Sequence, residues 1–239
     1  MSGDRLALSA GLAYAVQRDE RASSLSYTGV GPSLDLTVTH HTDASRLDVD
    51  VAAAFARSTS SITTNALPFE REHAFTLRVA YLHRVRGGGA HRSAWLVGAA
   101  AGGELFASDH HFDDPEQRIG SYGIGLATLA PAVAWELRLG RGALAADLDV
   151  PVVGFVWRPY AEFRHLRDAR RSFVTPADLH AAHAGLEYAH PFGARVVAAL
   201  GYRLSALDVR QTQRYARMSQ SMVARMSVRL GHVHQAVHP

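Results

Sequence analysis

The densest group of side chains able to do chemistry lies in one short run, Asp109-His110-His111-Phe112-Asp113-Asp114. Imidazole and carboxylate groups bind divalent transition metals, and an Asp–His pair can also activate water for hydrolysis. The spacing matches no metal template, and a solvated polar loop explains the run equally well. We therefore predict no metal site and no cofactor, and His110, His111 and Asp113 are the residues to test if a metal binds.

Other catalytic patterns are missing from the sequence. HExxH, GxSxG and phosphate-loop motifs do not occur, and the string His91-Arg92-Ser93 falls where we expect a tight turn. We predict no catalytic residues. A hydrolase of surface lipid or peptide stays open as one alternative, to be tested by His110→Ala and His111→Ala.

Most of the charged residues follow a two-residue period. The pattern is clearest in Leu47-Asp48-Val49-Asp50-Val51, and it recurs in 135–139, 146–150 and 226–230. A period of two indicates a β-strand, whose successive side chains lie on opposite faces. One face is apolar, and the other carries Ala, Gly, Ser and Thr with interspersed Asp, Glu and Arg. That second face is too small and too charged for an ordinary core.

About ten such strands account for most of the chain. We expect them at 5–18, 24–40, 46–57, 73–86, 92–107, 119–139, 143–164, 178–190, 194–207 and 219–233. Connections alternate in length: those at 41–45, 87–91, 140–142 and 191–193 are short, and those near 58–72, 108–118, 165–177 and 208–218 are longer. The run Leu6–Val16 can be read as a signal peptide or as a strand, and its strict alternation favours the strand. Any export signal would then lie upstream of residue 1.

Composition excludes several classes. Among 239 residues there are no cysteines, so neither disulfides nor thiol chemistry is available. A net charge of +3, with no base-stacking motif, gives no support for nucleic-acid binding. No continuous apolar run approaches the ~18–20 residues that a membrane helix requires.

The long alternating strands and alternating connections resemble those of bacterial outer-membrane β-barrel proteins over essentially the whole chain. The resemblance implies an antiparallel up-and-down transmembrane barrel with short periplasmic turns and longer extracellular loops, spanning 1–239 as one domain with a short tail at 234–239. It also implies outer-membrane lipid around the barrel and a monomer, with other envelope proteins as possible partners of the loops. The rival fold is a soluble barrel with its apolar face inward, which would stay monodisperse without detergent.

Under this topology a set of charged residues faces the lumen. The set is Asp35, Asp48, Asp50, Arg78, Arg84, Glu136, Arg138, Asp147, Asp149, Glu187, Arg195, Arg203, Arg225 and Arg229. Because buried charges persist mainly when they are paired, we expect Asp48 or Asp50 to meet Arg84, and Glu136 or Arg138 to meet Asp147 or Asp149. Such pairs would fill the periplasmic half of the lumen. Arg158, Tyr160 and Glu162 are candidates for contact with an external ligand.

The alternating apolar residues change from one face to the other within two of the predicted strands. In 119–139 it moves from Tyr122, Ile124 and Leu126 to Leu129 and Val133, and in 143–164 it moves from Leu148, Val150 and Val152 to Val153, Phe155 and Trp157. One extra residue reverses the face of a strand, so we predict β-bulges near Thr128 and Val152.

The aromatic residues suggest two belts at the membrane interfaces. Trp95, Trp135 and Tyr188 lie near short turns, and Phe55, Phe75, Phe106 and Tyr122 lie near longer connections. A random scatter of strand-favouring aromatics is the alternative.

The pattern therefore predicts an outer-membrane barrel with a salt-bridged, largely plugged lumen and a structural, adhesive or envelope-accessory role. A narrow channel or transporter for small solutes is the main alternative. Conductance in planar bilayers separates the two.

Overall fold

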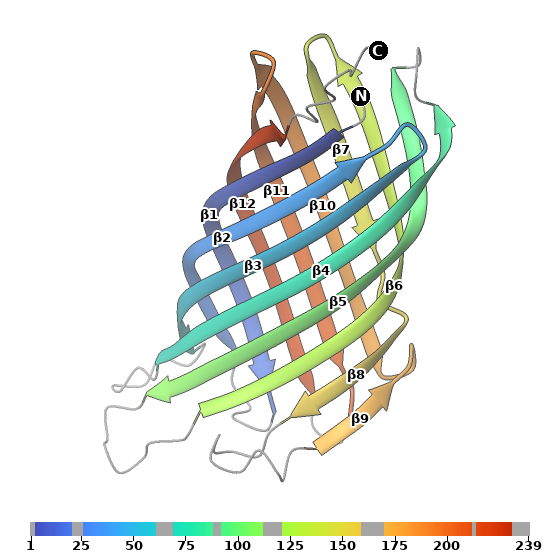
Figure 1. Ribbon diagram of the computed structural model, residues 1–239. Helices are drawn as coiled ribbons and strands as arrows, with labels where there is room; N and C mark the ends of the chain where they lie inside the picture. The colour runs from blue at the N-terminus through green and yellow to red at the C-terminus, as the bar shows by residue number, and fades with distance from the viewer. Residues whose placement is uncertain are drawn as a thin grey trace, which may run out of the picture.

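A computed structural model describes residues 3–20, 26–60, 69–87, 92–111, 121–158, 170–211 and 214–230. These residues form twelve strands (Figure 1). The strands are β1 (Gly3–Asp19), β2 (Tyr27–His41), β3 (Ser45–Ser60), β4 (Phe69–Gly87), β5 (Ser93–His111), β6 (Ser121–Leu139), β7 (Gly142–Asp149), β8 (Val153–Arg158), β9 (Arg170–Val174), β10 (Leu179–Phe192), β11 (Val196–Val209) and β12 (Tyr215–Leu230). Within the described residues no helix is long and apolar enough to cross a membrane.

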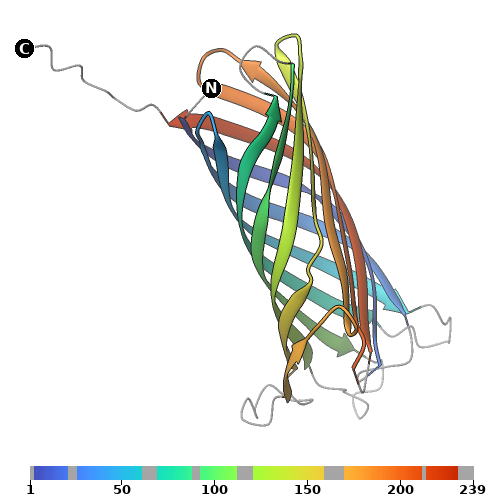
Figure 2. The same ribbon diagram turned by 90° about the vertical axis from the view of Figure 1, so that its right-hand side faces the viewer.

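The sheet closes into a barrel of ten positions. Every neighbouring pair is antiparallel, β5 pairs with β6, and β1 pairs with β12 from Asp4↔Leu230 to Asp19↔Tyr215. The strands tilt steeply around the wall, and the start of β1 and the end of β12 lie at the short-turn end (Figures 1 and 2). The predicted fold class is confirmed, and so is the strand assignment of Leu6–Val16, which lies within β1.

Glycine contributes to three of the four short turns. Gly87, Gly140 and Gly193 follow or end the strands β4, β6 and β10, and each has a positive φ, of 79°, 61° and 86°. L-residues with a side chain rarely adopt this left-handed conformation, whereas glycine does so without steric cost. These turns therefore fix the short-turn end of the wall where the sequence predicts it.

Two of the ten wall positions are broken. The predicted strand 143–164 is divided into β7 and β8, and β9 lies inside the predicted connection 165–177, separated from β10 by a turn at 175–178. Strand β6 pairs with both β7 (Ala132↔Asp149) and β8 (Leu129↔Val153). Between these two pairs, residues 130–131 of β6 thus face residues 150–152, one residue more, so the bulge predicted near Val152 is confirmed.

The bulge predicted near Thr128 is wrong. Strand β6 pairs with β5 in unbroken register from Leu137 to Ser121, and Thr128 lies opposite Gly102. The apolar beat changes face because the inner surface itself becomes apolar: Ile124 and Leu126 point into the lumen and are almost fully buried. The pairing of β6 is regular at Thr128, and only the side chains on its inward face change from polar to apolar.

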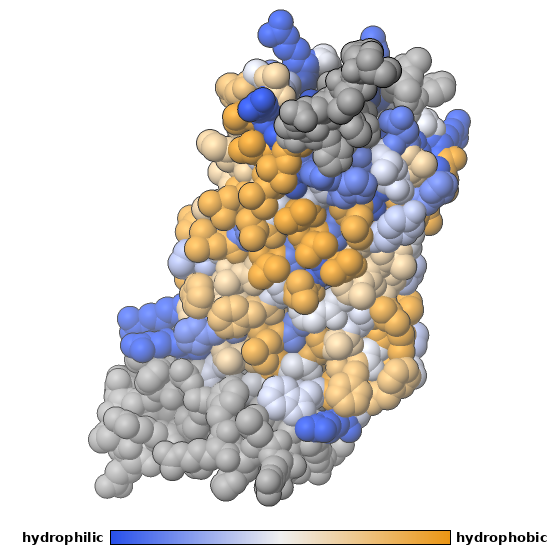
Figure 3. Space-filling view, viewed as in Figure 1, coloured by the Kyte–Doolittle hydropathy of each residue, from blue (hydrophilic) through white to orange (hydrophobic). Residues whose placement is uncertain are grey.

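The outer surface of the barrel is an apolar band. Leu8, Leu12, Leu200 and Met222 are between 62% and 73% exposed, as suits side chains that contact lipid. Apolar side chains cover the middle of the face in Figure 3, with hydrophilic residues toward the ends.

The aromatic belts are mostly on this outer surface. Trp95 and Tyr188 are exposed near the short turns, and Phe55 and Phe75 are exposed toward the other end. Trp95 lies opposite Trp135, with ring centroids 6.4 Å apart. The prediction that Phe106 belongs to an interface belt is wrong, because this side chain is 2% exposed and faces the lumen. The side chain of Tyr122 lies outside the described part of the structure.

Candidate functional site: the barrel lumen

The half of the lumen next to the short turns encloses a cavity of about 1010 Å³. Inward-facing residues of all ten wall positions line it, and it extends to Gly140 and Gly193 in the short turns. We call this space the chamber. Small barrels are often filled by side chains, so a cavity of this size is the first feature that a function must explain.

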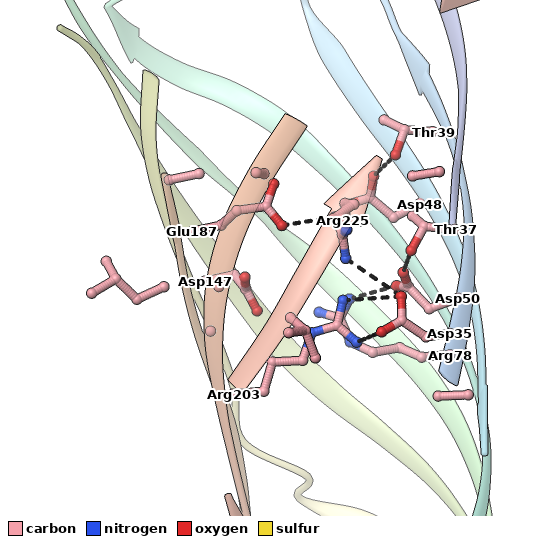
Figure 4. Close-up of a pocket in the computed structure, with 18 of the residues that line it drawn as sticks. Asp35, Thr37, Thr39, Asp48, Asp50, Arg78, Asp147, Glu187, Arg203 and Arg225 are labelled. Atoms are coloured by element: carbon pink, nitrogen blue, oxygen red, sulfur yellow. Dashed lines mark hydrogen bonds and ion pairs between the residues drawn. The ribbon is translucent and has the colours of Figure 1, made fainter. Parts of the chain in front are cut away.

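Asp35 is the centre of one network in the chamber wall (Figure 4). Arg203 donates to both of its carboxylate oxygens, at 2.9 and 3.5 Å, and Arg225 lies 3.8 Å away. Arg225 also pairs with Glu187 at 3.1 Å and donates to the Ser9 hydroxyl at 3.0 Å. Charge-assisted bonds of this kind hold long side chains in one geometry.

Arg78 and Arg46 organise the opposite wall. Arg78 on β4 pairs with Asp149 on β7 at 2.7 Å and with Asp50 at 3.5 Å, and Asp50 accepts a hydrogen bond from Thr37. Arg46 on β3 pairs with Asp48 at 2.8 Å and with Glu136 on β6 at 3.0 Å. Each arginine therefore links strands that are not adjacent in the sheet.

The pairings predicted between neighbouring strands are wrong. Arg84 donates to the backbone carbonyl of Asp43. Asp149 pairs with Arg78 rather than with Glu136 or Arg138. Wall curvature explains the difference, because inward side chains of non-adjacent strands converge inside a closed barrel.

The other members of the predicted set lie at the edges of this network. Arg138 is exposed and Arg229 half-buried, and both line the chamber at its mouth. Asp147 lines it between the two networks, where its carboxylate interacts electrostatically with Arg78 and Arg46. The prediction that Arg195 faces the lumen is wrong, because it is exposed in the turn between β10 and β11.

A histidine–carboxylate pair lies deeper in the chamber. His183 on β10 is 3.2 Å from Glu104 on β5, and Glu104 is largely buried. His180 is exposed on the opposite face of β10, as the strand period requires.

Beyond this pair the inner surface becomes apolar. A cluster of buried side chains, which we call the apolar closure, comes from eight strands: Ala74, Phe106, Ile124, Leu126, Val156, Val174, Leu179, Ala181, Leu207, Val209 and Tyr215. Val156, Val174 and Val209 are 0% exposed. Only the first two members of the cluster, Ala74 and Phe106, line the chamber. The closure therefore lies between most of the chamber and the end where the longer connections lie.

One ion pair crosses the lumen at the level of the closure. Arg217 on β12 binds Glu72 on β4 through Nε at 2.7 Å and Nη2 at 2.6 Å, and the two residues are 8% and 2% exposed. The guanidinium also lies 4.6 Å from the centre of the Phe106 ring. This cation–π contact ties the ion pair to the apolar side chains around it.

A second polar layer lies on the far side of the closure. Arg158 on β8 forms an ion pair with Asp19 on β1, and the Gln17 amide donates to Ser108 at 3.0 Å. Arg158 is only 4% exposed, so it braces the barrel interior at this end. Tyr160 and Glu162 lie outside the described residues.

Four residues of these ion pairs were not predicted from the sequence: Arg46, Glu72, Glu104 and Arg217. Their inward parity would have identified Arg46 and Glu104, which lie within predicted strands. Glu72 and Arg217 lie just outside the predicted strands 73–86 and 219–233. We expected ion pairs to fill the short-turn half, but they line a cavity there, and buried apolar side chains cluster further along the lumen.

No metal centre is evident in the part of the chain that the structure describes. No three His, Asp or Glu side chains there lie close enough together to hold an ion. His110 and His111 end strand β5, but their side chains, like the whole of Asp113, fall outside the described part.

The closed antiparallel wall, the apolar band and the polar chamber define the fold as that of bacterial outer-membrane β-barrels. No family model matches the chain, and no curated protein matches its sequence. Among solved structures, the outer membrane protease OmpT from Escherichia coli is similar with a TM-score of 0.63 and 6% identity, covering 95% of this chain and 97% of that one. The translocator domain of the autotransporter NalP from Neisseria meningitidis is similar with a TM-score of 0.49 and 10% identity, covering 96% of this chain and 89% of that one.

Proposed function

We propose that this protein is a non-conducting outer-membrane barrel with a structural, adhesive or accessory role in the envelope. The observation that supports this most is the apolar closure, whose inward side chains come from eight strands and are almost fully buried. An apolar constriction of this kind excludes water and hence hydrated ions. In this proposal a single barrel domain is monomeric, its short turns face the periplasm, and its longer connections contact other envelope components.

Conductance in planar bilayers tests the proposal. We expect the purified protein to insert without discrete current steps. The double variant Phe106→Ala/Leu126→Ala should open a path and produce them, because it removes two large side chains from the closure. The matched control Leu105→Ala/Leu129→Ala changes outward-facing leucines on the same two strands and should stay silent. Steps from the unmodified protein would overturn the proposal.

A narrow channel is the second candidate, favoured by the polar chamber of about 1010 Å³ that reaches the short-turn mouth. For this function the closure would have to move, so wild-type current steps of variable lifetime are the expected result. A surface hydrolase remains a third candidate. Loss of activity on lipid or peptide in His110→Ala or His111→Ala would support it.

A further inference from the structure

The wall of the barrel is incomplete beside β9. In a closed barrel each wall strand pairs with a neighbour on both sides, but β9 pairs only with β8, from Gly154↔Val174 to Arg158↔Arg170. Strand β11, which continues the wall beside β10, ends opposite Leu179 and does not reach β9. The second edge of β9 therefore has no ladder partner among the described residues, and we call it the open edge.

A side chain crosses the gap where a wall strand would be expected. The amide of Gln211, just beyond the end of β11, donates to the Ser172 hydroxyl in the middle of β9. The last backbone hydrogen bond before the gap joins the Arg210 N–H to the Asp178 carbonyl, at 2.7 Å. Beyond it, a side-chain contact takes the place of a ladder.

The open edge lies at the end of the barrel with the longer connections (Figures 1 and 2). Alternate residues of an unpaired strand edge present N–H and C=O groups that need hydrogen-bond partners, and lipid offers none. Water satisfies these groups at the rim of the barrel, and an added strand does so as well. Such an edge is a template for an extended peptide.

Basic residues predominate on both sides of the gap. The β9 sequence Arg-Arg-Ser-Phe-Val contains two arginines and no acidic residue, and Arg171 is exposed. Across the gap, Arg210 and Arg214 are exposed and share the Asp208 carboxylate. Asp178 adds one more carboxylate in the turn before β10. Two neighbouring ion pairs balance internally: Arg18–Glu20 and Arg158–Asp19. The gap therefore favours an acidic occupant.

A second copy of this chain does not fit the open edge. Two copies in one membrane are related by a two-fold axis along the membrane normal. Such an axis aligns a strand with its own copy only if the strand is parallel or perpendicular to the axis. Strand β9 runs obliquely to the barrel axis (Figure 1). The occupant is therefore a different polypeptide.

We propose that the open edge of β9 binds an extended acidic segment of another polypeptide by strand addition. The main chain of this segment pairs with β9, and its outward-facing carboxylates lie beside Arg171 and the arginines across the gap. The segment takes the place of the missing wall strand. This inference names a partner class for the accessory role proposed above and rests on that role, but its test does not depend on conductance.

Blocked pentapeptides test the proposal by isothermal titration calorimetry, with the full-length protein in a non-ionic maltoside micelle. A peptide of alternating glutamate and valine, with glutamate at both ends, should bind at submillimolar concentration. The same peptide with lysine in place of glutamate should bind at least tenfold more weakly, because its charges are reversed. Absence of binding of the glutamate peptide at millimolar concentration would overturn the proposal.

N-methylation distinguishes strand addition from simple attraction between charges. Successive N–H groups of an extended strand point to opposite edges, so only one alternate set faces β9. Methylation of either the glutamate or the valine nitrogens should weaken binding at least tenfold, and methylation of the other set should have little effect. If both methylated forms bind as well as the unmodified peptide, the peptide is held by charge alone and the proposal is wrong.

Matched variants locate the charged contact. Arg171→Gln should weaken the glutamate peptide about fivefold, the value expected for one exposed ion pair. Arg86→Gln is the control, because this arginine is exposed at the end of β4, at the opposite end of the barrel. Unchanged binding in Arg171→Gln would refute the assignment of this contact.

Hydrogen exchange shows whether a partner or this chain itself covers the open edge. Alternate amides of β9 should exchange quickly in the free protein and slowly with the glutamate peptide, whereas β8, which pairs on both sides, should be protected throughout. If β9 is as protected as β8 without peptide, another part of this chain covers the edge and the proposal fails. Current steps in planar bilayers would overturn the non-conducting role without altering these results.

Discussion

The two halves of the lumen are built by the same ten wall positions but differ in almost every physical respect. The chamber next to the short turns is lined by charged and small residues and contains several ion pairs. The apolar closure consists of buried apolar side chains, and the ion pair Arg217–Glu72 lies at its border with the chamber, which Arg217 also lines. The inner face of a barrel strand therefore has no fixed polarity. Similar ion pairs should then contribute differently to stability in the two halves.

The largest effect is expected from Arg217→Ala. It would leave Glu72, only 2% exposed, as an uncompensated buried charge. Breaking a buried pair in this way costs about 3–5 kcal/mol. Urea unfolding of the barrel in phospholipid vesicles measures the loss. Recovery of most of it in Arg217→Ala/Glu72→Gln would show that the stranded charge, rather than the lost packing, is responsible.

The next effect should come from Ile124→Ala. This side chain is 1% exposed within the closure, and truncating a buried aliphatic residue costs about 2–5 kcal/mol. The same unfolding measurement applies. Leu129→Ala on the outer face of the same strand is the control and should cost less, because lipid can close over the missing atoms. Equal losses for the two variants would contradict the burial of the closure.

Arg225→Ala tests an ion pair of the chamber. It removes an ion pair to Glu187, which is partly exposed, and a longer contact to the buried Asp35, which Arg203 still binds. We expect a loss of about 1 kcal/mol, in the range of partly exposed pairs. A loss as large as that of Arg217→Ala would mean that ion pairs contribute equally in the two halves.

The smallest effect is expected outside the lumen. Asp208 pairs with Arg210 and Arg214 near the long-connection end, where both arginines are exposed. Exposed pairs contribute little and are screened by salt. Asp208→Asn should leave the urea midpoint unchanged at 0.15 M salt. A clear shift of this midpoint would indicate that this end is less hydrated than the exposure of its arginines suggests.

The sequence predicts the wall well because a period of two is a local signal. The apolar residues change from one face of a strand to the other at two places, and the sequence predicts the structural cause correctly at only one of them. At Val152 the backbone gains a residue, whereas at Thr128 the backbone is regular and the lumen becomes apolar. Both events produce the same pattern in a single strand. They are distinguished only by neighbours such as Phe106 and Val156, which the closed barrel brings beside Ile124 and Leu126.

The ion pairs were less predictable because they too depend on which strands the closed barrel brings together. Glu72 and Arg217 are 145 positions apart, and β4 and β12 meet only across the lumen. Neighbour rules for adjacent strands give no information on such pairs. The charged faces could be read from the sequence, but their partners depend on the closure of the barrel.

The seam between β1 and β12 has a kinetic consequence. It joins the first described strand to the last, with Arg5 opposite Arg229, so it can form only when the final strand is present. Until then the sheet has two unpaired edges, which are prone to pair with other chains. Contacts of such large sequence separation also slow folding. The membrane-inserted barrel should therefore form in one late, cooperative step, and a chain truncated before β12 should accumulate as an open, aggregation-prone sheet.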